Sequence, residues 1–156
     1  MKAYLIPVFA AATAATADHA IAQLWNAHST QRIRCVQFSV QPITDPGANA
    51  GMRLKRSTAR GTAGSTVTPN IDNHSESAVA PVSGALLDLA AFSVQPTLAS
   101  AELGPDFHAA SSQGSVFIYD IPGGIAIPPG TGLVLSQAGA FVFAASTIHF
   151  VWFEDN

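Results

Sequence analysis

The sequence predicts an all-β fold, an antiparallel sandwich of about eight strands, on three observations. Short β-prone runs alternate with clusters of Gly, Pro, Asn, Asp and Ser along most of the chain, which is the pattern of a sandwich or barrel. No stretch combines a sustained 3.6-residue apolar period with helix-capping signals. With 48% hydrophobic residues in 156, the chain can bury one core, so we take residues 1–156 as a single domain.

The N-terminal segment, residues 1–17, is predicted to be a first strand or a docking arm. Its Ala- and Thr-rich sequence ends in a small-residue stretch before Asp18, which would also suit a secretory signal. Pro7 interrupts the apolar run and favours the first interpretation. The segment is too short and too interrupted to span a membrane, so no membrane partner is expected.

Residues 33–56 contain the clearest strand pattern, two alternating runs around a Pro- and Gly-containing segment. A turn at Asp45 would form a hairpin with these apolar pairs: Val40 with Ala50, Phe38 with Met52, and Val36 with Leu54. All these side chains would then share one face, as period-2 geometry requires. Arg53 and Lys55 would project from the other face and be available to a partner.

The remaining elements are read from shorter runs. A helix of at most two turns, or a strand, is expected at residues 20–26, and residues 57–77 form a long polar loop. Further strands are expected at residues 86–94 (where a short helix is also open), 115–121, 131–136, 140–144 and 147–153. The strand at 115–121 should stop at Pro122. Eight antiparallel strands in two sheets suit a jelly roll, although the strand order, and hence other sandwiches, stays open.

The last strand is apolar on both faces. Ile148, Phe150 and Trp152 lie on one face, and Val151 and Phe153 lie on the other. A half-exposed strand should alternate, so this strand is expected to be covered on both sides. The second cover is either another subunit or the rest of its own sandwich, and the first alternative makes Phe150, Trp152 and Phe153 candidate interface residues.

Charge is scarce and unevenly distributed. Charged residues make up 11% of the chain, against about 25% in a typical soluble domain, which suggests a surface covered by partners in a homo-oligomer. Residues 1–60 hold all seven Lys and Arg, and residues 61–156 hold eight of the ten acids. Either the two halves pack on each other, or the basic segment, with Arg53, Lys55 and Arg56 as candidates, docks on an acidic surface.

The sequence contains no motif for catalysis, a cofactor or a metal. It lacks a phosphate-binding loop, a dinucleotide fingerprint and a nucleophile elbow, and its five histidines follow no metal-ligand spacing. Cys35, the single cysteine, is expected to be a buried strand residue. The basic residues lack interleaved aromatics, so nucleic acid is a minor alternative.

Several stretches carry a resemblance to a known group of proteins. They are the strand at residues 32–36, the loop at 60–69, Gly-Ala-Leu-Leu at 84–87, the segment 127–135 and the closing strand at 150–154. From about Gln31 onward the chain resembles small jelly-roll decoration or capsid-associated proteins of tailed phages and prophages. The resemblance implies a non-enzymatic protein of the virion surface, a trimer whose partner is a major capsid or other lattice protein.

Two other functions stay open at this point. A glycan- or receptor-binding jelly roll on a particle or in the extracellular space would need an exposed aromatic platform, for which Trp25 is the one candidate. A cupin-type enzyme would need a His and Glu metal cluster on paired strands, which the sequence does not display.

Overall fold

The computed structural model describes residues 3–11, 13–14, 16–45, 51–68, 83–108, 113–140 and 142–155. These residues form eleven strands and no helix, which confirms the all-β prediction. The strands are β1 (Ala3–Ala10), β2 (Ala20–Trp25), β3 (Arg32–Pro42), β4 (Gly51–Ala59), β5 (Ser65–Val67), β6 (Leu86–Leu89), β7 (Thr97–Glu102), β8 (Phe107–His108), β9 (Phe117–Ile127), β10 (Gly132–Gln137) and β11 (Ser146–Asp155).

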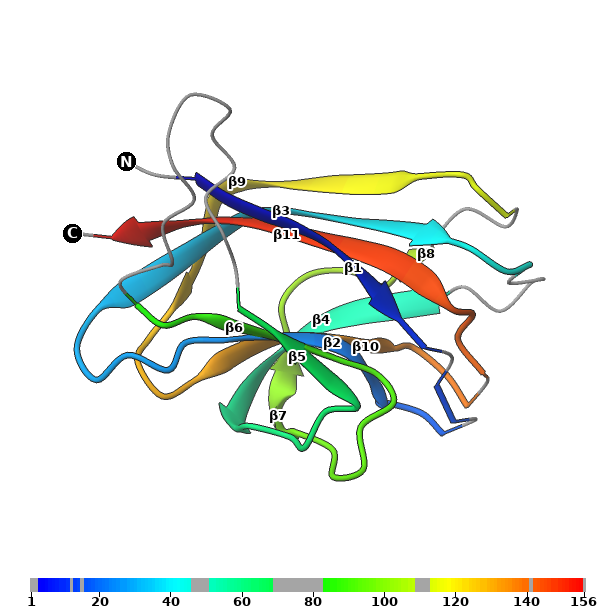
Figure 1. Ribbon diagram of the computed structural model, residues 1–156, viewed down its shortest axis with the longest axis horizontal. Helices are drawn as coiled ribbons and strands as arrows, with labels where there is room; N and C mark the ends of the chain where they lie inside the picture. The colour runs from blue at the N-terminus through cyan, green and yellow to red at the C-terminus, as the bar shows by residue number, and fades with distance from the viewer. Residues whose placement is uncertain are drawn as a thin grey trace.

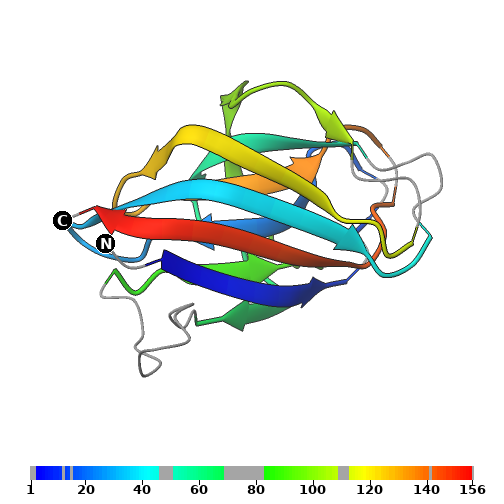
Figure 2. The ribbon, with the colours of Figure 1, turned by 90° about the horizontal axis from the view of Figure 1, so that it is seen from above.

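The strands lie in two sheets that face each other across one core (Figure 1). Sheet A has the order β1-β11-β3-β9, and Figure 2 shows it from above. Sheet B has the order β5-β6-β2-β10-β4-β7, with β8 also paired to β4. The ladders are antiparallel in both sheets.

Eight of the strands pair in a nested pattern. Without the short strands β5, β6 and β8, the first strand pairs with the last, the second with the seventh, the third with the sixth and the fourth with the fifth. These pairs are β1·β11, β2·β10, β3·β9 and β4·β7. The chain is therefore arranged as one long hairpin whose successive pairs lie alternately in the two sheets.

The predicted hairpin between residues 33–42 and 50–56 is wrong. β3 pairs with β11 and β9 in sheet A, whereas β4 pairs with β10, β7 and β8 in sheet B. Phe38 and Met52 are both fully buried in the same core, but from opposite sides of it. Alternation identifies the buried face of a strand, and that face is the same whether the next strand lies beside it or across from it.

Val36 does not point into the core as predicted, because β3 has a bulge at this position. The register of β3 shifts against β9 between Cys35 and Gln37, and β11 carries a shift opposite the same region. Cys35 and Phe38 therefore both point into the core, and Val36 is only half-buried. An extra residue in one strand changes the phase of the side chains beyond it.

Strand β9 continues through Pro122, where the sequence predicted a stop. Because β9 is an edge strand of sheet A, a proline without an N–H is tolerated there. Gly123 and Gly124 follow with φ of 75° and 69°, a region that favours glycine. A Cβ on Gly124 would lie 2.6 Å from Cγ of Arg34, so this position also needs glycine for close packing.

Other expectations met a mixed outcome. Residues 3–10 form the predicted first strand, and the helix considered at 20–26 is strand β2. The described residues of 140–144 do not form a strand, although Phe143, which lies in this loop, is buried. The predicted polar loop at 57–77 contains the end of β4 and all of β5 in its described part, residues 57–68, and its remainder lies outside the described residues. Most of the turn predicted at Asp45 also lies outside the described residues.

An aromatic cluster fills the middle of the core. The ring of Phe38 lies 5.6 Å from that of Phe107 and 6.3 Å from that of Phe150, and Phe107 lies 4.4 Å from Tyr119. The rings of Phe38 and Phe107 meet edge to face and the other two pairs are tilted, and such arrangements add to the burial energy. Sheet A and the β8 segment beside sheet B are thus joined by one packed group of rings.

Sheet B is covered on its outer face as well. A second small core there contains Ala20, Ala90, Phe92 and Val134. An isolated bridge between Thr62 and Val94 joins the two loops that lie over this face. Burial on both faces explains why β10 is buried along its whole length.

Candidate interaction surfaces

Arg53 and Lys55 lie on the outer face of sheet B, but neither is free. Nη1 of Arg53 is 2.9 Å from Oε1 of Glu102, and its Nη2 is 3.0 Å from Oδ2 of Asp106. Nζ of Lys55 is 3.0 Å from Oδ1 of Asp18. The side chains of Arg53 and Lys55 are only 19% and 9% exposed. The expectation that both charges are available to a partner is therefore wrong, because strand β7 and neighbouring loops of the same chain supply acids to them.

Arg60 is also engaged within the chain, by a fully buried carboxylate. Its Nε and Nη2 each donate to Asp88 at 2.7 Å, and the hydroxyl of Thr66 donates to the same carboxylate at 2.6 Å. This bidentate contact raises the pKa of Arg60 and keeps its charge fixed. Nearby, the amide of Gln23 donates to Ser57 at 2.6 Å.

A fourth cation, Arg34, forms an ion pair at one end of sheet A. Its Nε and Nη2 donate to the two oxygens of Asp155, at 3.2 and 3.0 Å. Arg34, Arg53 and Arg60 thus pair with acids from residues 61–156. Much of the charge asymmetry in the sequence is accordingly an internal packing feature, the first of the two interpretations above.

Arg32 and Arg56 are different. Among the cations that the structure describes, these two have no acidic partner. Asp155 lies opposite Arg32 in the ladder but is bound by Arg34 instead. Arg56 donates from Nη1 to the carbonyl of Ala126 at 2.6 Å, which anchors its guanidinium.

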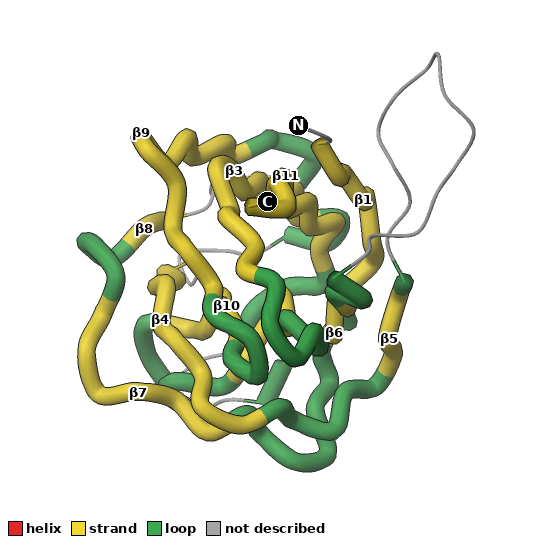
Figure 3. Tube along the Cα trace, turned by 90° about the vertical axis from the view of Figure 1, so that its left-hand side faces the viewer, coloured by secondary structure: helices red, strands yellow, loops and turns green. Residues whose placement is uncertain are grey.

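The same two arginines line one surface cavity of about 280 Å³. It lies between edge strand β9 of sheet A and strands β4 and β7 of sheet B, at the end of the sandwich that faces the viewer in Figure 3. Its other lining residues are Ser57, Thr58, Ala99, Ala126, Pro128 and Thr131. Arg56 was a sequence candidate, whereas Arg32 was not singled out, since only the tertiary structure shows which cations lack an acid.

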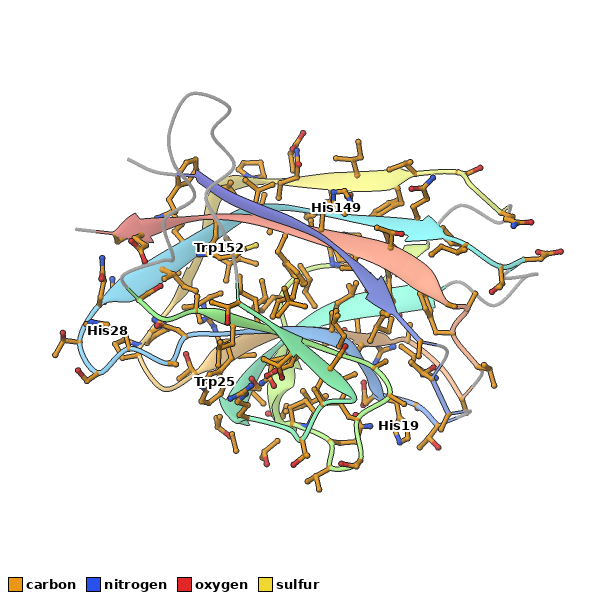
Figure 4. The ribbon with its side chains drawn as sticks, viewed as in Figure 1. His19, Trp25, His28, His149 and Trp152 are labelled. Atoms are coloured by element: carbon orange, nitrogen blue, oxygen red, sulfur yellow. The ribbon has the colours of Figure 1, made fainter. Side chains whose placement is uncertain are left out.

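The aromatic candidates of the last strand divide between two environments. Phe150 and Trp152 are fully buried in the core of the same chain, so they are not interface residues in this structure. Phe153 is half-buried on the outer face. Strand β11 is a central strand between β1 and β3, but the residues of its outer face are only half-buried, so the expected full cover of that face is not provided within this chain. Figure 4 shows Trp152 between the two sheets.

The outer face of sheet A carries apolar side chains at its β9 edge. Val116, just before β9, and Ile118 are 52% and 58% exposed. Asp120, the next residue on that face, is exposed and accepts a hydrogen bond from Gln37 at 2.6 Å. The sequence has apolar residues at both parities of this strand, as in the last strand, and that signal could have indicated that its outer face is partly apolar.

Two titratable groups respond to burial. Burial raises the pKa of the Cys35 thiol to about 12, and the thiol is fully buried as expected. Desolvation lowers the pKa of His149, which is half-buried on the outer face of sheet A. Neither group has the low-pKa thiolate or the paired base that a nucleophile needs.

Other features of the described residues bear on the alternatives. Within them, no group of three or more His, Cys, Asp or Glu side chains is placed to hold a metal ion. None of their segments is a helix long and apolar enough to cross a membrane. Trp25 is half-buried on β2 (Figure 4). Comparisons of the chain with protein-family models, curated proteins and solved structures found no match.

Proposed function

We propose that this protein is a non-enzymatic structural protein of a phage-like virus particle, a jelly-roll decoration, cement or fibre-like component that works as a homo-oligomer, a trimer, on the virion surface. Its partners are further copies of itself and a capsid or other lattice protein. Its task is geometric: it presents a rigid sandwich and binds through its exposed edge.

The observation that carries this proposal is the nested strand pairing. Pairing of first with last, second with seventh, third with sixth and fourth with fifth is the pattern of a jelly roll, a fold of viral capsid proteins, lectins and cupins. Because one fold hosts several functions, the choice among these classes rests on the surfaces.

The surfaces favour assembly. The β9 edge is long, and its backbone can template pairing with another chain. Exposed Val116 and Ile118 add apolar contact area at the same edge. A lectin would need an aromatic platform, and Trp25 is half-buried. The histidines whose side chains the structure describes, His19, His28 and His149, lie in separate segments of the chain (Figure 4), whereas a cupin gathers its ligands on paired strands.

The test has two parts. Particles made by the virus or prophage that encodes the chain are purified and probed with an antibody against it, by blotting and immunogold electron microscopy. In parallel, light scattering and sedimentation measure the mass of the recombinant protein at micromolar concentration. We expect the protein on the particle surface and a trimer in solution.

A matched pair of variants connects the two parts. Ile118→Lys should dissociate the oligomer and lower particle occupancy, because it places a charge on the β9 edge. Val142→Lys introduces the same charge at a loop residue that is 53% exposed, and it should leave both unchanged. A stable monomeric parent protein that is absent from purified particles would refute the proposal.

A further inference from the structure

The cavity lined by Arg32 and Arg56 has the properties of a site for a negatively charged group. Arg32 and Arg56 line it, and neither forms an ion pair with a carboxylate of the described residues, in a chain whose net charge is −3. Guanidinium groups recognise carboxylates through planar, paired hydrogen bonds. Arg56 is held from one side by the carbonyl of Ala126, so its remaining N–H groups are oriented in advance.

The size of the cavity indicates what enters it. At about 280 Å³ it is at or below the lower end of the range for small-molecule sites. Ala99, Ala126 and Pro128 form apolar walls beside the two arginines. A carboxylate attached to a short chain segment with an apolar neighbour fits this description better than a cofactor does.

The chain itself presents such a segment. Asp120 is an exposed carboxylate that no described cation pairs with, and exposed Ile118 lies two residues before it on the same face of β9. Asp120 cannot enter the cavity of its own molecule. Ala126, in the cavity wall, is six positions further along the same strand, which corresponds to roughly 20 Å of extended backbone.

We propose that Asp120 of one copy enters the Arg32–Arg56 cavity of the next copy, with Ile118 against its apolar wall, and that this contact builds the oligomer. The contact is head-to-tail, because the donor segment and the cavity are different surfaces of one chain. Such a contact closes into a ring when the rotation between copies allows it. The inference rests on the proposed assembly function and identifies the surfaces that carry it.

Charge reversal tests the contact. Arg56→Glu and Asp120→Arg should each weaken self-association at least about tenfold, because each places like charges together in the interface. The double variant Arg56→Glu/Asp120→Arg should recover most of the loss. Sedimentation equilibrium measures the dissociation constants in a salt series, in which the parent and the double variant should both weaken as salt rises.

Controls separate this contact from changes in fold or net charge. Thr44→Glu and Thr44→Arg place the same new charges on an exposed loop beyond the opposite end of β3, and should not change self-association. Circular dichroism should show the same fold for all variants. If Arg56→Glu does not fold, Arg56→Gln replaces it, with the smaller loss expected for neutralisation.

The outcomes separate this inference from the proposed function. Weaker self-association in both single variants, with recovery in the double variant, supports the contact. A parent that is oligomeric and present on particles, with no response to either reversal or no recovery in the double variant, overturns the contact alone. Loss with Arg56→Glu but not with Asp120→Arg assigns the cavity to another carboxylate and also overturns it. A monomeric parent absent from particles refutes the proposed function as well.

Discussion

The outer faces of the two sheets differ in how far they are buried. Sheet B is sealed by loops of its own chain, with Phe92 and Val134 in a second core and Asp88 buried in hydrogen bonds. The outer face of sheet A is half-buried along β11 and exposed at the β9 edge, where Ile118 is 58% accessible. The chain thus covers the outer face of sheet B with its own loops and leaves that of sheet A more accessible. Under the proposed function, contacts between copies therefore form on sheet A and its edge.

The largest expected effect compares the two faces of β11. Phe150→Ala should lower the free energy of unfolding by about 3–5 kcal/mol, because it removes a fully buried ring from the core. Phe153→Ala, on the half-buried outer face, should cost about 1 kcal/mol. Denaturant unfolding measures both, and Phe150→Leu is a milder variant if the alanine does not fold. Equal losses would show that the outer face is packed as tightly as the inner one.

The next comparison is between two carboxylates, one in each sheet. Asp88→Ala in sheet B should cost about 2–3 kcal/mol, because Arg60 and Thr66 lose a shared, buried acceptor. Asp155→Ala in sheet A breaks a partly exposed pair with Arg34 and should cost at most about 1 kcal/mol. Thermal or urea unfolding provides the measurement. A larger loss at Asp155 would contradict the view that sheet B is the sealed one.

Cys35 reports how well the inner face of sheet A excludes water. Because burial raises its folded pKa to about 12 from 9.0, the unfolded state loses this proton first. The contribution of the neutral, buried thiol to the free energy of unfolding is fully present below pH 9. It is lost as pH rises from 9 toward 12, at up to about 1.4 kcal/mol per pH unit. Subtracting the pH profile of Cys35→Ala isolates this contribution. A thiol that reacts rapidly with iodoacetamide in the folded protein would contradict such burial.

The smallest effect belongs to His149 on the outer face of sheet A. Desolvation lowers its folded pKa below 6.5, so the unfolded state takes up the proton first and stability falls as pH drops below that value. The slope should disappear in His149→Gln. Nuclear magnetic resonance titration should show a larger downward shift in the oligomer if partners cover this face, and an unchanged pKa would place the interface elsewhere.

The strand pattern made some of the fold predictable and some of it not. The alternation in residues 32–42 and 51–56 identified Phe38 and Met52 as core residues, and both are fully buried. It could not show that β3 and β4 lie in different sheets, because alternation identifies the buried side chains of a strand but not the strand that pairs with it. The bulge at Val36 and the continuation of β9 through Pro122 depend on neighbouring strands, so they too escaped the local pattern.

The candidate site shows the same division. The sequence identified the basic segment, and it identified Arg56 within it. It did not show that Asp88, Asp106 and Glu102 neutralise Arg60 and Arg53, because these partners are 28 to 53 residues away along the chain. Arg32 and Arg56 stand out only after those pairs are known.

By itself, the sequence determined that this protein is all-β, that Ile148, Phe150 and Trp152 of its last strand share a core face and that its charge is divided between two halves. Those properties follow from residue type and local period, which act over a few neighbours. The tertiary structure alone decided the nested strand order, the sealing of sheet B and the two arginines left facing a cavity. These depend on contacts between distant segments, where several pairings satisfy the same local pattern and the packing of the whole core selects one of them.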